Sequence, residues 1–511
     1  MSVRITPEWV CDMTGIRKLK GFIESNLLEN VAPTDWEKTT KSTVLRKSQD
    51  GEHVLCLFDQ NLSWANGFTA EGPKSGAGLI QQLTELDESK NIICGLITHT
   101  ITEIQNEIPR WREISEQYGI KLDRFLPLAK VRLHGDPEIF ADGVKKTALN
   151  LFCEGIKMLG IDAISNAVNQ SLDKIKGLDV YDFEYMVLRS SYDSDEWEAN
   201  ALIRLFQVFH KDEIWRTLNN PANASNFNAL VRKARPIALI STIANKELNY
   251  QNISSIRHDE LYIDESAIAF SPLELGDVFE FTGVDGNKKK YVLLTQPCDL
   301  TVRKNKDGNR NNPNLVVPLL AIQEAEKKYK KAIDEKATYW NTRGKLPYFT
   351  KGSSDVSIVS FAETLWISAD ILDLCVINAN GNCEIDVLNE KGHVEYLTDP
   401  WISRVKALTT KYKTIQDDLE KQLKILEKLE EKADKENLIA TIKLHYDLSN
   451  GKVKSSYKEG KFSFEVRRIM RYRDVNSVRL LRAYANYLAR DADENDIAQP
   501  GLTGYAHVAI P

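Results

Sequence analysis

Three apolar segments of the sequence each end in a side chain that could take part in phosphoryl transfer. They are His53-Val-Leu-Cys-Leu-Phe-Asp59, Ile92-Ile-Cys-Gly-Leu-Ile-Thr98 and Phe125-Leu-Pro-Leu-Ala-Lys130. A carboxylate attacks a phosphoryl group only when nearby donors and cations neutralise the charge that develops in the transition state. Because Thr98 supplies a hydroxyl and Lys130 an ammonium, these residues outline a phosphorylation site with Asp59 as the acceptor.

Such a site also requires a divalent cation. Mg²⁺ is usually held by one or two carboxylates together with phosphate oxygens and water. The earlier strand-like segment Trp9-Val-Cys-Asp12 ends in a second carboxylate. We therefore expect Asp12 and Asp59 to be the metal ligands and Mg²⁺ to be the cofactor.

The segments that would position these residues alternate between strand-like and helix-like patterns. Short, continuous apolar runs are typical of buried parallel strands. Helix-like segments at 16–28, 79–86 and 104–118 separate the runs, and one further strand is weakly marked, with Val31 or Ser42-Thr-Val-Leu-Arg46 as candidates. The alternation predicts an α/β domain with a doubly wound parallel sheet, in which functional groups gather at the carboxyl ends of the strands.

These residues, in this order, resemble the receiver domain of bacterial two-component response regulators. That family has an acidic first strand, an acceptor Asp ending the third, a Thr or Ser ending the fourth and a Lys ending the fifth. The resemblance covers about residues 8 to 140. It implies that Asp59 is the phosphoacceptor, Asp12 a magnesium ligand, Thr98 the switch hydroxyl and Lys130 the phosphate-binding ammonium.

The resemblance also implies a partner histidine kinase and no enzymatic activity beyond autophosphorylation and autodephosphorylation at Asp59. Two departures from the family pattern make this a divergent receiver. The paired acids of the first strand are reduced to Cys11-Asp12, and Lys130 is followed by Val131 where the family usually has Pro. A receiver that acts only as a protein-docking module is the alternative.

The remainder of the chain predicts two further domains. We expect a receiver-like domain at 1–141, a helical connector at 142–250 and an α+β C-terminal domain at 251–511. Within the last, residues 401–448 carry a heptad pattern typical of a coiled-coil arm. Its apolar positions begin with Val405, Leu408, Tyr412, Ile415 and Leu419. This arm would pair within the chain or form a homodimer.

The C-terminal region carries two further candidate sites. The first is an arginine cluster, Arg467, Arg468, Arg471 and Arg473, whose charges are suited to phosphate backbones. The neighbouring apolar positions Leu480 and Tyr484 favour a core role instead. The second is Cys298 in Gln296-Pro-Cys-Asp299, which is either a catalytic thiol or part of a turn.

Tyr185-Met-Val-Leu-Arg-Ser-Ser191 resembles the helical extension of a group of large, poorly characterised bacterial receiver proteins. Leu275-Gly-Asp-Val-Phe and Leu294-Thr-Gln-Pro-Cys-Asp299 resemble a C-terminal domain of uncharacterised proteins, some from defence-type loci. This implies signal transduction, with a place in an antiphage defence system. The alternative is a phosphorylation-independent scaffold or nucleic-acid-binding component of such a system.

Composition limits the partners. The net charge of -6 argues against a surface that is basic throughout. The first residues lack the pattern of a signal peptide, and no apolar stretch approaches the roughly 18 residues that span a bilayer. The seven cysteines are scattered without CxxC pairs, which is typical of a reducing compartment. We therefore expect a cytoplasmic protein without a membrane partner.

Overall fold

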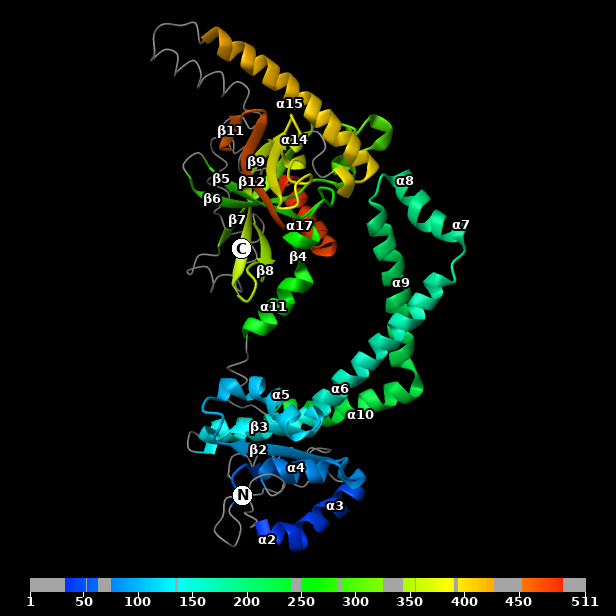
Figure 1. Ribbon diagram of the computed structural model, residues 1–511, viewed down its shortest axis with the longest axis vertical. Helices are drawn as coiled ribbons and strands as arrows, with labels where there is room; N and C mark the ends of the chain where they lie inside the picture. The colour runs from blue at the N-terminus through cyan, green and yellow to red at the C-terminus, as the bar shows by residue number, and fades with distance from the viewer. Residues whose placement is uncertain are drawn as a thin grey trace, which may run out of the picture. The chain divides into compact units, whose positions relative to one another are not determined.

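The computed structural model describes residues 33–51, 53–62, 75–133, 137–239, 250–283, 286–324, 343–353, 355–389, 394–426 and 453–489. The chain divides into two compact units (Figure 1). Unit 1 comprises Met1–Asp179 and Ile203–Leu248, and unit 2 comprises Val180–Leu202 and Asn249–Pro511.

Unit 1 is built on a three-stranded parallel sheet. Its strands are β1 (Val54–Asp59), β2 (Ile92–Thr98) and β3 (Phe125–Ala129), arranged in that order. Each strand is almost completely buried, as the continuous apolar runs predicted. The α/β character of this region is therefore confirmed. The expected first strand, Trp9 to Asp12, lies outside the described residues.

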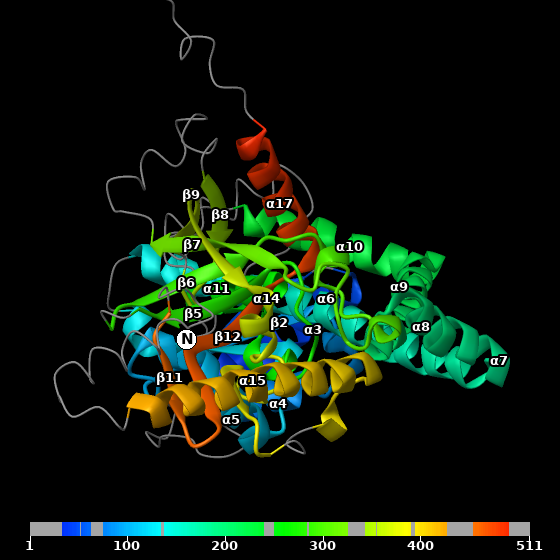
Figure 2. The ribbon, with the colours of Figure 1, turned by 90° about the horizontal axis from the view of Figure 1, so that it is seen from above.

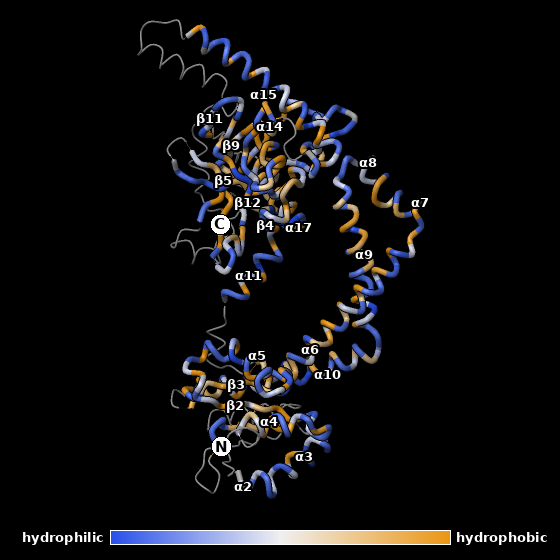
Figure 3. The backbone as a smooth tube through the Cα atoms, in the orientation of Figure 1, coloured by the Kyte–Doolittle hydropathy of each residue, from blue (hydrophilic) through white to orange (hydrophobic). Residues whose placement is uncertain are grey.

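Helices cover both faces of this sheet. Side chains of β1 alternate, so that Leu55 and Leu57 face one core while Cys56 and Phe58 face another. The first core is completed by α6 (Pro137–Lys176) and α10 (Pro221–Ala238), and the second by α3 (Lys41–Gln49), α4 (Gly76–Thr84) and α5 (Glu107–Tyr118). Hydrophobic residues concentrate around these strands (orange in Figure 3).

One of the two candidate positions for a further strand is helical. Residues 42–46 lie within α3, where Val44 is 1% exposed and packs in the core beside β1. The β-branched residues Thr43 and Val44 favour a strand locally, but packing of one helical face against the sheet overrides that preference. The strand expected at Ser42–Arg46 was therefore wrong, and the other candidate, Val31, lies outside the described residues.

The segment expected to be helical, 142–250, consists in its described part of helices joined by short turns. It contains most of α6, then α7 (Val180–Phe183), η8 (Glu184–Arg189), α8 (Ser190–Ser194), α9 (Glu198–Asn219) and α10. Its residues are shared between the two units. Short helical turns complete unit 1: α2 (Pro33–Asp35), η2 (Trp36–Thr40), η4 (Asp87–Ser89), η5 (Ile104–Asn106), η6 (Leu122–Arg124) and η7 (Lys130–Leu133).

Unit 2 contains a large antiparallel sheet, preceded by α11 (Tyr250–Leu261). The main path runs β10-β12-β5-β6-β7-β9-β8, and β11 and β4 pair with β12. The strands are β4 (Tyr262–Asp264), β5 (Asp277–Thr282), β6 (Lys288–Leu293), β7 (Val316–Glu324), β8 (Arg343–Pro347), β9 (Val356–Ser368), β10 (Asn382–Asp386), β11 (Ser455–Lys458) and β12 (Lys461–Tyr472). The consecutive strands β5 and β6 pair antiparallel.

Helices of unit 2 pack against this sheet. They are η10 (Glu265–Ala267), α12 (Pro297–Leu300), η11 (Lys304–Lys306), α14 (Ala369–Asp373), η13 (Val394–Tyr396), α15 (Asp399–Leu426) and α17 (Asp474–Leu488). Leu480 and Tyr484 of α17 belong to a core with β5, β6 and β9, which is the core role that the sequence favoured for them.

The predicted heptad segment begins as α15, which lies along the sheet domain (Figures 1 and 2). Its positions Val405, Leu408 and Tyr412 are at most 8% exposed and pack in the same core as Phe462 and Phe464 of β12. The first part of the heptad face, Val405 to Tyr412, is therefore covered by the chain's own sheet. Residues 427–448 lie outside the described residues.

A buried ion-pair network joins α15 to the sheet domain. Asp373 is fully buried and accepts hydrogen bonds from Arg310 at 2.6 Å through both oxygens, and from Nε of Arg404 at 2.8 Å. Although burial alone would raise the pKa of Asp373, the two guanidinium groups hold that pKa below its ordinary range. The network fixes the register of α15 on unit 2.

None of the helices that the structure describes combines the length and the hydrophobicity needed to cross a membrane.

Candidate functional site

Asp59 and Lys130 meet at the carboxyl edge of the parallel sheet. Asp59 ends β1, Lys130 follows β3 directly, and the distance from Lys130 Nζ to Asp59 Oδ2 is 2.9 Å. The carboxylate is 18% exposed and the ammonium 36%. A ligand can therefore reach the carboxylate, and a cation is already in place beside it.

The second oxygen of Asp59 is held by the chain that follows it. The backbone N–H of Asn61 donates to Asp59 Oδ1 at 3.0 Å, and the Asn61 side-chain nitrogen lies 3.0 Å from Nδ1 of His99 after β2. The carboxylate is thus oriented by Asn61 and Lys130 together. Such orientation from both sides is what a nucleophilic carboxylate requires.

Thr98 lies at the same edge but does not share this contact. Its side chain is buried, its hydroxyl lies 2.9 Å from the hydroxyl of Thr100, and it accepts the backbone N–H of Thr100 at 3.2 Å. The described contacts therefore bring Asp59 and Lys130 together, and they place Thr98 on the neighbouring strand with a different partner.

A glycine allows the chain to pass close behind Asp59. A Cβ atom on Gly76, the first residue of α4, would lie 2.3 Å from the backbone oxygen of Asp59. That distance is far inside van der Waals contact, and the obstacle is backbone rather than a movable side chain. Any larger residue at position 76 would displace α4 or the end of β1.

A buried charge network holds the backbone on both sides of Lys130. Glu107, the first residue of α5, is fully buried, and its Oε1 accepts the backbone N–H of Ala129 at 2.8 Å. The same carboxylate receives Nε of Arg132 at 2.7 Å and its terminal nitrogen at 2.9 Å. Glu107 therefore binds the residue before Lys130 and a residue just after it.

The surroundings set the charge state of Glu107. Burial alone would raise the pKa of this carboxyl, but the hydrogen bond and charge of Arg132, the charge of Lys146 and the N–H of Ala129 hold the pKa below its ordinary value. Arg132 is bound in turn by Asp142 at 3.2 Å. Sequence reasoning missed Glu107, because an acidic residue in the first turn of a helix usually needs no other explanation.

The expected magnesium site stays a prediction. Asp59 supplies oxygen atoms of the kind that Mg²⁺ prefers. Asp12, the other expected ligand, lies outside the described residues. In the part of the chain that the structure describes, no group of three His, Cys, Asp or Glu side chains is arranged to hold a metal ion. Asp59 thus fits one ligand of a Mg²⁺ ion whose other protein ligand would be Asp12.

The C-terminal arginines mostly serve the fold. Arg468 and Arg471 are 2% and 5% exposed, and both bind Asp277, a fully buried carboxylate. Arg467 forms an ion pair with Glu265 at the surface. Because guanidinium groups enclosed in the core cannot reach a phosphate backbone, this cluster provides fewer cations for nucleic acid than its sequence indicates.

Cys298 lies at the surface in α12. Its hydrogen-bond partners in the described part of the chain are Gln296 Oε1 at 3.6 Å and Asp299 Oδ1 at 3.9 Å. Neither group is the imidazole that a nucleophilic thiol ordinarily uses as its base. Pro297 occupies the first position of the short helix, where a proline is well tolerated.

Comparison of the chain with protein-family models, with curated proteins and with solved structures gives no match.

Proposed function

We propose that this chain is a bacterial signal-transduction protein in which Asp59 accepts a phosphoryl group from a partner histidine kinase. The observation that carries the proposal is the ion pair between Asp59 and Lys130, 2.9 Å apart at the carboxyl edge of a parallel sheet. An accessible carboxylate beside a fixed ammonium has the elements needed to receive a phosphoryl group and retain it.

The transfer step is a nucleophilic substitution at phosphorus. An oxygen of Asp59 attacks the phosphorus of a phosphohistidine, so that an O–P bond forms and the N–P bond breaks. The imidazole nitrogen leaves with the bonding electrons and takes up a proton. Lys130 balances the negative charge on the phosphoryl oxygens, and Mg²⁺ held by Asp59 and Asp12 supplies further positive charge when bound.

The response to phosphorylation would begin at Thr98. A phosphoryl group adds about 1.5 to 2 negative charges and three strong acceptor oxygens. Lys130 would then bind a phosphoryl oxygen in place of the carboxylate oxygen of Asp59. The Thr98 hydroxyl would bind a second phosphoryl oxygen in place of the Thr100 hydroxyl. Because Thr100 also donates its backbone N–H to Thr98, this exchange would shift the loop after β2.

Mass spectrometry of the intact chain tests the proposal. The purified full-length protein is incubated with acetyl phosphate and Mg²⁺, and we expect the mass to increase by one phosphoryl group. Asp59→Asn should abolish the increase. Asp87→Asn, which removes a carboxylate from the short turn before β2, is the matched control and should behave as the unmodified chain.

Two outcomes would contradict the proposal. No mass increase in the unmodified chain would favour a phosphorylation-independent scaffold, and an increase that persists in Asp59→Asn would place the acceptor elsewhere. A place in antiphage defence rests on the resemblance described above, and a cytoplasmic location rests on the cysteine pattern and the lack of a signal-peptide pattern. A kinase gene beside this one would favour phosphoryl signalling, and a nuclease gene would favour the defence scaffold.

A further inference from the structure

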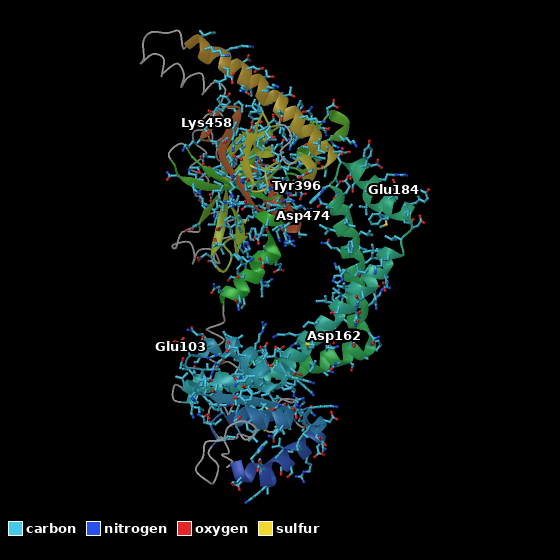
Figure 4. All side chains as sticks on the ribbon, viewed as in Figure 1. Glu103, Asp162, Glu184, Tyr396, Lys458 and Asp474 are labelled. Carbon is cyan, nitrogen blue, oxygen red and sulfur yellow. The ribbon has the colours of Figure 1, made fainter. Side chains whose placement is uncertain are left out.

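Unit 2 contains a cavity that the proposed phosphorylation site does not use. Its volume is about 450 Å³, within the range of small-molecule sites. Its walls come from α8 and the start of α9, the turn before β5, the segment around α12, and the first turns of α15 and α17. Asp474, at the start of α17, is labelled in Figure 4. All of these residues belong to unit 2.

Specific contacts hold the walls together. Asp195, between α8 and α9, accepts a hydrogen bond from Arg303 at 3.1 Å and from the backbone N–H of Lys304 at 3.1 Å. Asn200 in the first turn of α9 donates to Glu274 at 3.4 Å. Hydrogen bonds therefore hold the α8–α9 segment against the sheet domain at two places, and these contacts define the cavity of unit 2.

The charge of the lining is strongly negative. One ammonium, that of Lys304, lines the cavity, against the carboxylates of Asp195, Glu196, Glu198, Glu274, Asp399 and Asp474. Arg303, Lys304 and Arg471 balance three of these acids. The start of a helix offers only about half a positive charge to an acid there. Among the described residues, Glu198 and Asp474 form no ion pair, so their negative charge remains.

The carboxyl of Glu274 is partly removed from water. Burial raises its pKa, the charge of Arg471 opposes that rise, and the charges of Asp277 and Asp474 add to it.

The cavity already shows how it can hold an ammonium. The Nζ atom of Lys304 lies 5.2 Å from the centroid of the Tyr192 ring and 2.8 Å from an oxygen of Asp399. An aromatic face and a carboxylate together form a favourable environment for a cation. Trp401 and Leu273 provide apolar wall beside these groups, suited to an alkyl stem.

A buried hydroxyl lies in the wall behind the cavity. Ser191 is 1% exposed, and its hydroxyl has no hydrogen-bond partner among the described residues. Because that oxygen has almost no accessible surface, it is not a contact for a molecule in the cavity. The recognition of a ligand depends on the charged and aromatic groups that line the cavity.

We propose that this cavity binds an organic cation, a primary amine or guanidinium on an alkyl stem, whose charge is held by Glu198 and Asp474 and whose stem packs on the apolar wall. Free amines and the arginine or lysine side chain of a partner protein share this chemistry. The proposal does not depend on phosphorylation of Asp59.

Titration calorimetry with the full-length chain tests the proposal at low salt. The probes are agmatine and putrescine as free cations, the capped peptide Gly-Arg-Gly as a side-chain source, and 1,4-butanediol as the neutral counterpart of putrescine. We expect the cations to bind and butanediol not to bind. Tighter binding of the peptide identifies a protein partner, and tighter binding of agmatine identifies a free amine.

Three variants locate the binding. The double variant Glu198→Gln/Asp474→Asn should weaken cation binding at least about tenfold, equivalent to about 1.4 kcal/mol. Lys304→Met should strengthen it, because Asp399 loses its internal cation. Asp193→Asn removes a carboxylate from α8 that does not line the cavity and should leave the affinity unchanged. Thermal unfolding of each variant checks that the fold is retained.

The Lys304→Met variant separates binding from a structural role, since a merely structural lysine would weaken binding when removed. Equal binding of putrescine and butanediol, an absence of binding by every cation, or equal effects of the double variant and Asp193→Asn would each overturn the proposal.

Discussion

Replacing Glu107 with glutamine tests whether the buried charge network positions Lys130. Glutamine keeps the shape and one acceptor oxygen, so the N–H of Ala129 can still be bound, but the negative charge is lost. Arg132 then remains 3% exposed with Asp142 as its carboxylate partner. Breaking a buried ion pair by removing one partner costs about 3 to 5 kcal/mol. Because Asp142 remains, we expect the lower value, about 3 kcal/mol, for the stability of unit 1.

Hydrogen exchange read by mass spectrometry measures this change without requiring the whole chain to unfold at once. A loss of about 3 kcal/mol accelerates exchange through unfolding by about 100-fold, at tenfold for each 1.4 kcal/mol. Peptides from β2 and β3 should show that acceleration, and peptides from the sheet of unit 2 should not. Phosphoryl uptake at Asp59 should slow as well, because Lys130 is less firmly held.

The contribution of Glu107 to the stability of unit 1 should depend on pH in a defined direction. The pKa of Glu107 is lower in the folded chain than its ordinary value near 4.5. Its charge therefore stabilises unit 1 above that pH, and the stabilisation is lost as the pH falls through the folded pKa. The difference between the unmodified chain and Glu107→Gln should narrow on acidification. Unchanged exchange in β3 at neutral pH would refute the positioning role of Glu107.

Three further variants separate structural from functional charges. Lys130→Met should change stability by no more than about 1 kcal/mol in urea unfolding, because the ion pair is partly exposed, while slowing phosphoryl uptake in a time course with acetyl phosphate. Asp373→Asn should destabilise unit 2 by about 3 to 5 kcal/mol in thermal unfolding, and, because the folded pKa of Asp373 is lowered, the loss should shrink as the pH falls below about 3.8. Tyr412→Phe should leave stability unchanged or raise it by up to about 1 kcal/mol in denaturant unfolding, because the buried Tyr412 hydroxyl has no hydrogen-bond partner among the described residues. A clear loss of stability would show that this hydroxyl has a hydrogen-bond partner.

The strands of unit 1 could be predicted because their sequences are apolar without interruption. A strand buried on both faces has no polar positions, so the first and last apolar residues nearly define its bounds. The order of Asp59, Thr98 and Lys130 after three such runs then places them at one edge. What the runs cannot specify is which side chains touch, and the hydroxyl of Thr98 binds Thr100 instead of joining the ion pair.

Periodicity showed that one face of α15 is buried but not what covers it. The spacing of Val405, Leu408 and Tyr412 is the same whether the partner is a second helix or a sheet. In the structure these residues pack with Phe462 and Phe464, fifty or more residues further along the chain. Such long-range pairing leaves no mark on the local pattern.

Buried charges were the least predictable feature. Arg468 lies in a run of basic residues that suggests a solvated surface, yet it binds Asp277, 191 residues earlier in the chain. Glu107 and Arg132 are separated by 25 residues and each follows an ordinary local pattern. Only the folded structure shows that these charges neutralise one another.

The contacts at the edge of the sheet constrain how a phosphoryl signal could spread. Lys130 is coupled through Ala129 and Arg132 to Glu107, so the cation of the site is anchored to a rigid, buried network. Among the described residues, the hydroxyl of Thr98 is bound to Thr100, whose side chain is exposed. Because a new negative charge moves the least constrained of its neighbours, the loop after β2 should respond first, while α5 and β3 stay in place. The carboxyl edge of β2 is therefore the surface at which a phosphorylated chain would differ from an unphosphorylated one.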